Sequence, residues 1–159
     1  MNPESLSIRK LFEQVRAGKI LPDDAVEKLR HYPFEDLGFA KVDHHRSLRA
    51  GMPEVVFGQG KTPAQVAAIF KRLSLHGKNV LATRTNNEQF RAVKKVVRSA
   101  KFEGPARAIV LRRDRKIYGK GLITVISAGT SDMPVAEEAA VTAELMGNEV
   151  ERIYDVGVA

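Results

Sequence analysis

The segment with the clearest chemical potential is a short turn between an apolar run and a helical pattern. Ala128-Gly129-Thr130-Ser131-Asp132-Met133-Pro134 follows the run LITVIS and precedes a helix predicted over about 134–146. A strand-to-helix turn offers free backbone N–H groups, hydroxyl donors and the positive end of a helix dipole, which together suit a phosphate or carboxylate. A plain N-cap by Ser131 or Asp132 explains the same residues, and the turn matches neither a Walker A loop nor a GxGxxG motif. The residues alone leave both interpretations open.

Asp155 is a second candidate, because it lies at the far end of the strand predicted to begin at Val150. In an open parallel sheet, the carboxyl ends of neighbouring strands share one edge, and ligands bind at that edge. We therefore expect Asp155 to lie near the turn that contains Ser131. The alternative is a loop residue that caps the turn after the strand.

Two other segments carry groups that bind ions. Asp43-His44-His45-Arg46 is the densest titratable cluster and suits a metal or a phosphate. Adjacent histidines on an extended segment point to opposite faces, which disfavours one shared ion and leaves a polar turn as the alternative. Gly58-Gln59-Gly60-Lys61-Thr62 resembles half of a phosphate loop, but it has too few residues between its glycines and also reads as a turn into a helix.

Positive charge is concentrated in one part of the chain. Residues 91–120 hold eleven Lys/Arg and two Asp/Glu, a local excess of nine charges compared with +7 for the whole chain, whereas residues 121–159 hold one Arg and seven acids. Such a stretch attracts nucleic acid or a phosphorylated ligand, and it also fits a solvated helix face. Because aromatic residues make up only 6% of the chain, we expect no stacking platform for single strands.

Composition excludes several chemistries. The chain has no cysteine, so it contains no disulfide, thiolate metal site or cysteine nucleophile. Its apolar runs are short, and its N-terminus lacks the apolar region of a signal peptide, so we expect a cytoplasmic protein with no membrane partner.

The predicted elements define an α/β protein with two parts. Residues 5–17 and 22–32 form a helical hairpin, and strands at 38–42, 54–57, 79–82 and 106–111 alternate with helices that begin at capping boxes, Thr62 to Gln65 and Thr85 to Glu88. This alternation predicts a mainly parallel sheet. The last part is a βαβ unit whose first strand is expected to be buried on both faces. Its helix is expected to present one stripe, namely Val135, Ala139, Thr142 and Met146. We place a domain boundary between residues 118 and 119.

The sequence resembles the LarB family in three blocks, DLGFAKVDHHRSLRAGMPEVVFGQGKTPAQVA, NVLATR and ISAGTSDMPVAEEAAVTAELMGNEVERIYDVGVA. The resemblance implies a family-specific N-terminal region over 1–118. It also implies a second domain, begun by residues 119–159, that is similar to phosphoribosylaminoimidazole carboxylase of the PurE type, with a flavodoxin-like or Rossmann-like parallel sheet. Because the chain stops within that sheet, we expect it to be part of a longer sequence.

The resemblance further implies an enzyme of nickel-pincer nucleotide biosynthesis, which supplies the cofactor of lactate racemase. Such enzymes carboxylate the pyridinium ring of nicotinic acid adenine dinucleotide and hydrolyse its phosphoanhydride, giving pyridinium-3,5-biscarboxylic acid mononucleotide and AMP. Carbon dioxide or bicarbonate is the co-substrate, Mg²⁺ is a candidate ion, and no tightly bound cofactor is expected. A downstream cysteine is thought to attack the ring; because this chain has none, we expect no turnover from these 159 residues alone.

Site residues follow from the resemblance position by position. The turn residues Gly129, Thr130, Ser131 and Asp132 match the part that holds the nucleotide's phosphate and ribose. Asp155 falls at the edge of the active site and is the candidate catalytic residue. Asp43, His44 and Arg46 belong to the family's N-terminal signature, and binding of the adenylate half or of a divalent ion would suit them with a phosphoanhydride substrate; no metal ligand is assigned.

The resemblance leaves two alternatives to an enzyme. A homo-oligomer is expected, since carboxylases of this type are oligomeric, and one alternative is a remnant that serves only in assembly. The other is a non-enzymatic module that binds nucleotide or nucleic acid through residues 91–120, although nucleic acid is not the expected partner. A steep salt dependence of duplex binding would favour that module.

Overall fold

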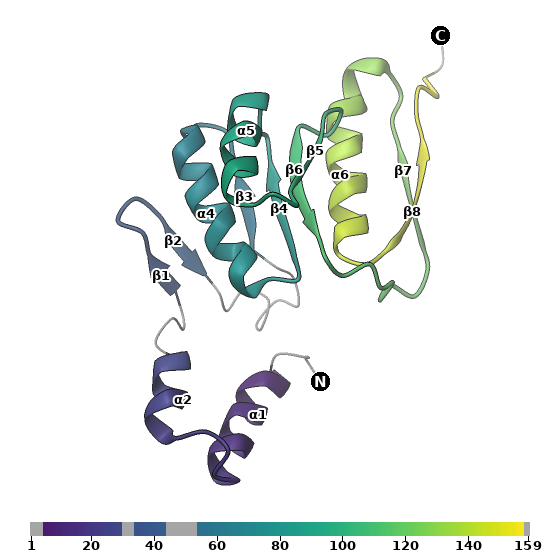
Figure 1. Cartoon of the computed structure of the whole chain (residues 1–159). Helices are drawn as coiled ribbons and strands as arrows, with labels where there is room; N and C mark the ends of the chain where they lie inside the picture. Colours follow the sequence, from purple (N-terminus) through teal and green to yellow (C-terminus); the bar gives the residue numbers. More distant parts are fainter. Residues whose placement is uncertain (1–4, 30–33, 44–53, 158–159) are drawn as a thin grey trace. The chain divides into compact units, whose positions relative to one another are not determined.

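A computed structural model of the chain describes residues 5–29, 34–43 and 54–157, which fall into two compact units, Met1–Glu54 and Val55–Ala159. The first unit contains the helices α1 (Ser5–Arg16) and α2 (Pro22–Leu29), in contact with each other as the predicted helical hairpin requires (Figure 1). Gly18 follows α1 with φ +67°, a left-handed conformation that glycine adopts without strain. The same unit holds an antiparallel pair, β1 (Phe34–Asp36) and β2 (Lys41–Asp43); β1 was not predicted.

The second unit contains two sheets and three α-helices. The larger sheet has the strand order β3-β4-β6-β5, and the smaller sheet pairs β7 with β8. In chain order the elements are β3 (Val55–Phe57), α4 (Pro63–His76), β4 (Asn79–Thr83), α5 (Asn87–Val96), β5 (Lys101–Glu103), β6 (Ala108–Arg112), β7 (Leu122–Ile126), the 3-10 turn η1 (Thr130–Asp132), α6 (Met133–Leu145) and β8 (Glu149–Ile153).

The larger sheet is mixed, so the α/β class is confirmed, but the mainly parallel sheet is not. β3 and β4 are parallel and are joined by α4, whereas β6 is antiparallel to both β4 and β5. The unpredicted strand β5 causes this difference, because β5 and β6 form a hairpin that reverses the chain. Its turn is closed by a hydrogen bond from the Arg107 N–H to the Gly104 carbonyl oxygen (3.0 Å).

Helix α6 packs against both sheets, and its contact with the larger sheet forms part of the apolar core. The helices α4 and α5 pack together on one side of the larger sheet, and α6 stands between that sheet and the β7–β8 pair (Figure 1). Leu81 and Val110 of the larger sheet are buried with Val141 and Leu145 of α6 in one apolar cluster. Phe70 of α4 is fully buried.

The predicted βαβ unit is confirmed, but two details of its packing were wrong. β7 and β8 are parallel and are joined by α6. β7 is not buried on both faces in this chain: Leu122 is 54% exposed and Ile126 62% exposed. On α6 the buried residues are not the predicted stripe but Ala136, Ala140, Val141 and Leu145, while Val135 is exposed. None of the helices in the described ranges is both long and apolar enough to cross a membrane.

Candidate functional site

The ends of the strands and helices in the second unit fix where the candidate turn lies. Asn79, the first residue of β4, donates hydrogen bonds to the carbonyl oxygens of Asp114 (3.0 Å) and Leu145 (2.9 Å). One end of the unit therefore joins the start of β4, the segment after β6 and the last residue of α6. The carboxyl ends of β3, β4, β7 and β8 lie at the opposite end, together with the starts of α4, α5 and α6 (Figure 1).

The turn from Gly129 to Asp132 connects β7 to α6 at that second end. The Asp132 Oδ2 atom accepts a hydrogen bond from the Gly129 N–H (3.3 Å), and the Gly129 carbonyl oxygen accepts one from the Asp132 N–H (3.0 Å). In the part of the chain described, the Asp132 side chain accepts no hydrogen bond from α6. Asp132 is the N-cap residue of α6 by position, but its carboxylate closes the turn instead of capping the helix. Thr130, Ser131 and Asp132 are exposed at the surface.

The segment after β8 runs beside the same turn. The Val156 N–H donates to the Ser127 carbonyl oxygen (3.2 Å), and the Gly157 N–H donates to that of Ala128 (2.6 Å). Asp155 lies between these contacts and the strand end, is exposed, and has φ +58°. Such a left-handed conformation is uncommon for a residue other than glycine and often occurs at functional sites. Asp155 and the turn therefore lie at the same edge of the sheet, as the sequence predicted. The catalytic role of Asp155 stays a prediction.

Two buried hydroxyl groups, which sequence reasoning missed, flank this edge. Ser127 is only 6% exposed, and within the described part of the chain neither its Oγ atom nor the hydroxyl of Tyr154 has a hydrogen-bond partner. Burial raises the pKa of Tyr154, and the nearby Glu137 carboxylate adds to the effect. An unpaired buried hydroxyl lowers the stability of the folded state, because the group has lost its hydrogen bonds to water.

Ion pairs hold the carboxylates of α6 to arginines of both sheets. Arg84, at the end of β4, pairs with Glu138 (Nε to Oε2, 2.8 Å). Glu144 pairs with Arg112 of β6 (3.2 Å) and with Arg152 of β8 (2.5 Å). The Arg152 guanidinium, with a smaller contribution from Arg112, lowers the pKa of Glu144, and the opposing effect of partial burial does not outweigh the two arginines. These pairs join residues far apart in sequence, so no local pattern could have predicted them.

The N-terminal signature residues belong to the other unit. Asp43 is the last residue of β2 and is paired in register with Phe34, while His44 and Arg46 lie outside the described residues. Across the described ranges, no group of three or more His, Cys, Asp or Glu side chains could hold a metal ion. The binding role of Asp43, His44 and Arg46 therefore stays a prediction.

The basic stretch 91–120 is distributed over several surfaces. Arg112 is paired with Glu144, and Arg113 donates to the carbonyl oxygens of Ser74 (2.6 Å) and Gly77 (3.1 Å). On α5, by contrast, Arg91 and Lys95 are exposed. Part of the positive charge therefore holds the fold together rather than facing a partner.

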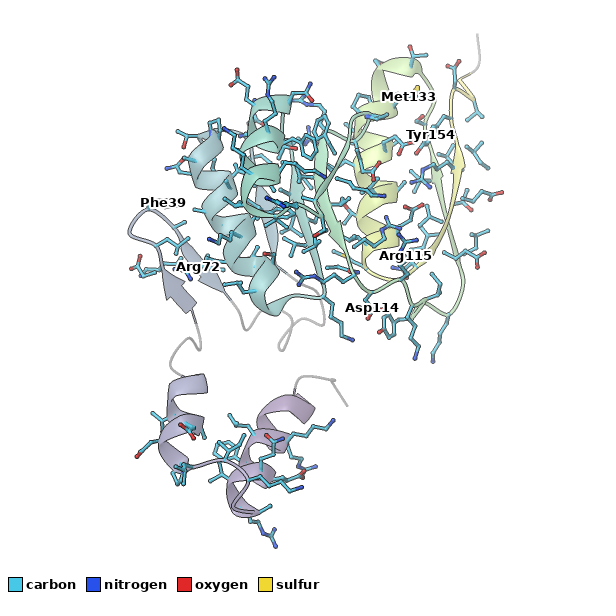
Figure 2. All side chains as sticks on the ribbon, viewed as in Figure 1. Phe39, Arg72, Asp114, Arg115, Met133 and Tyr154 are labelled. Carbon is cyan, nitrogen blue, oxygen red and sulfur yellow. The ribbon has the colours of Figure 1, made fainter. Side chains whose placement is uncertain are left out.

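A second charged cluster lies at the opposite end of the unit from the turn. Figure 2 shows Asp114 and Arg115 at one end and Met133 and Tyr154 at the other. The Asp114 carboxylate accepts from the Lys116 N–H (3.0 Å), the Tyr118 hydroxyl (2.8 Å) and the Lys78 ammonium (3.1 Å). These three donors, the Lys116 N–H first, lower the pKa of Asp114 from its usual 3.8 to about 2.

Asp114→Asn should therefore reduce stability at neutral pH but not in strong acid. Because the folded-state pKa is lowered, the carboxylate stabilises the folded state fully above about pH 4, and this contribution is lost as pH falls towards 2. Urea unfolding of wild type and variant at pH 7 and pH 2 measures the difference. An equal gap at both pH values would show that the charge is not responsible. Glu149→Gln, at an exposed position that begins β8, serves as the control.

The fold and the residues at this edge indicate a general class of protein. An α/β unit with a βαβ crossover whose turn residues meet the following segment at a carboxyl edge is typical of proteins that bind nucleotides or other phosphorylated ligands.

Comparison with known proteins narrows the class. A family model described as LarB/PurE-like N-terminal domain matches residues 34–114, just over half of the chain. An uncharacterised protein of Methanocaldococcus jannaschii is 32% identical over 162 residues, a match that covers 96% of this chain and 62% of the relative. The chain belongs to the LarB family, as its sequence resemblance predicted, and it spans less than two thirds of the length of that relative.

Proposed function

We propose that this chain forms part of an enzyme of nickel-pincer nucleotide biosynthesis that binds a pyridine nucleotide at the carboxyl edge of β7 and β8. The observation that carries the proposal is the turn from Gly129 to Asp132 together with the contact of Ser127 and Ala128 with Val156 and Gly157. Membership of the LarB family supports the same class of enzyme, a carboxylase.

Each residue of the edge has a role that suits a nucleotide. The hydroxyls of Thr130 and Ser131 can donate to a phosphate at the start of α6, where the helix dipole also favours negative charge. The Asp132 carboxylate only accepts hydrogen bonds when ionised, so it suits ribose hydroxyls rather than phosphate. Asp155, exposed beside the turn, is the candidate catalytic residue.

For the whole protein we propose carboxylation of nicotinic acid adenine dinucleotide and hydrolysis of its phosphoanhydride to pyridinium-3,5-biscarboxylic acid mononucleotide and AMP. Carbon dioxide or bicarbonate supplies the carboxyl group. The nucleophilic cysteine implied by the family is not among these 159 residues. Mg²⁺ is the candidate ion, since it is usually held by one or two carboxylates and by substrate phosphates.

A homo-oligomer is part of the same proposal. Leu122, Ile126 and Ile153 share the face of the β7–β8 sheet that points away from α6, and all three are exposed. The same face also carries Thr124, Glu149 and Glu151. Exposed apolar side chains at the end of this face, Ile126 and Ile153, are normally buried by further chain or by another subunit.

Calorimetric titration with nicotinic acid mononucleotide tests the proposed site. The double variant Thr130→Ala and Ser131→Ala should weaken binding about fivefold, because it removes two hydroxyl donors to one phosphate. Thr124→Ala with Ser99→Ala is the matched control, since both side chains are exposed outside the turn.

Two outcomes would contradict the proposed site. One is that the wild-type chain fails to bind the mononucleotide. The other is that the turn variant binds as tightly as wild type. Tight binding of duplex DNA with a steep salt dependence would instead support the nucleic-acid-binding alternative.

A further inference from the structure

Three loops meet at the end of the second unit where β3 and β4 finish. The Gly58 N–H donates to the Thr83 carbonyl oxygen (2.8 Å), and the buried Gln89 side chain donates to the carbonyl oxygens of Gly58 and Lys61 (2.8 Å each). Thr85 donates through its N–H and its hydroxyl to the Arg107 carbonyl oxygen (2.8 and 2.9 Å). The loops that contain Lys61, Thr85 and Arg107 are therefore held side by side.

Each of these loops contributes a cation to the same edge. Lys61 is half-buried, the Arg84 side chain is 37% exposed, and Arg107 is exposed. The capping boxes of α4 and α5 already use N–H groups at the starts of these helices, through Thr62 with Gln65 and Asn86 with Gln89. Attraction for an anion at this edge therefore comes from the three cationic side chains rather than from the helix starts.

The edge lies within reach of the turn that starts α6. Arg84 pairs with Glu138, which follows Asp132 by six residues, or about 9 Å along a helix. The pair uses the Nε of Arg84, and a guanidinium has further N–H donors. Arg84 is therefore held beside the second turn of α6, close to the turn from Gly129 to Asp132.

We propose that Lys61, Arg84 and Arg107 form a second phosphate-binding surface, which takes the adenylate half of a dinucleotide whose other half lies at the turn. This inference rests on the proposed function for its substrate class. It assigns the adenylate to residues of the edge formed by β3 and β4 instead of to the signature residues Asp43, His44 and Arg46. Its ligand chemistry is a nucleoside phosphate or diphosphate.

The test compares three ligands with two charge-removing variants of the full 159-residue chain. Lys61→Ala with Arg107→Ala should weaken the binding of AMP and of nicotinic acid adenine dinucleotide about fivefold, through loss of charge-assisted contacts to phosphate. Binding of nicotinic acid mononucleotide should not change. Lys95→Ala with Arg98→Ala removes the same charge from exposed residues and should leave all three affinities unchanged. Arg84 is kept intact because its loss would also break the pair with Glu138.

The outcomes separate this inference from the proposed function. If the mononucleotide does not bind but AMP binding still depends on Lys61 and Arg107, the proposed function fails and the phosphate surface stands. If AMP binds wild type and the Lys61 and Arg107 variant equally, or does not bind at all, the surface is wrong. If the Lys95 and Arg98 variant lost as much affinity for AMP, the effect would come from overall charge, and the proposed surface would also be wrong.

Discussion

Replacing Asn79 by alanine is expected to destabilise the second unit by about 3 kcal/mol, because four hydrogen bonds are lost and several partners stay partly buried without replacement. The Asn79 amide donates to the carbonyl oxygens of Asp114 and Leu145, and its Oδ1 atom accepts from the N–H groups of Arg113 and Asp114 (2.9 Å each). One side chain thereby ties β4 to the segment after β6 and to the end of α6. Urea unfolding followed by circular dichroism measures the change.

Two further variants show which half of the amide matters. Asn79→Asp keeps an acceptor, loses both donors and turns a carboxylate oxygen towards the carbonyl oxygens of Asp114 and Leu145, so it should lose at least as much stability as Asn79→Ala. Asn87→Ala, at an exposed position that begins α5, should change stability by about 0.5 kcal/mol or less. A loss below about 1 kcal/mol in Asn79→Ala would show that water replaces these bonds and that Asn79 is not the anchor inferred here.

Local signals in the sequence predicted most helices well. The capping box of Thr62 and Gln65 is present as expected. The second box begins one residue later than predicted, at Asn86 with Gln89, because Thr85 is buried and its hydroxyl is used by the Arg107 carbonyl oxygen. Such a shift depends on a contact with another loop, and the residues near Thr85 carry no sign of it.

Packing partners were harder to predict. α6 is rich in alanine and carries apolar residues on more than one face, so periodicity could not tell the buried residue Ala140 from the exposed residue Val135. The short strand β5 lacks an alternating pattern, and its position depends on pairing with β6 and on the stacking of Phe102 against Phe90 (5.4 Å between centroids).

The candidate site divides in the same way. The turn from Gly129 to Asp132 follows from a strand signal, a proline and a helix signal, so the sequence alone locates it. The orphan hydroxyl of Ser127 and the pairing of Arg84 with Glu138 depend on how α6 packs between two sheets. Neither feature could be predicted from the sequence, because both depend on the packing of the two sheets.

Gly157→Ala is expected to weaken binding of nicotinic acid mononucleotide at least tenfold, about 1.4 kcal/mol or more. A Cβ atom at position 157 would collide with the carbonyl oxygen of Ala128 and approach its carbonyl carbon to 3.1 Å. Since both are backbone atoms, the segment after β8 must move away from the turn. The hydrogen bond from the Gly157 N–H to Ala128 would then be lost, and Asp155 would be displaced from the edge.

Gly121→Ala separates this effect from the general effect of a methyl group on glycine. A Cβ atom at position 121 would meet nothing within 4 Å, so this variant should bind the mononucleotide like wild type. Urea unfolding of both variants shows whether Gly157→Ala acts on the edge or on the fold, since overpacking alone costs about 1–3 kcal/mol. If Gly157→Ala loses stability but keeps its affinity, the ligand does not depend on the contact between the two segments, and the nucleotide site must lie elsewhere. If affinity falls while most molecules stay folded at the assay temperature, the close approach of Gly157 to Ala128 is what shapes the site.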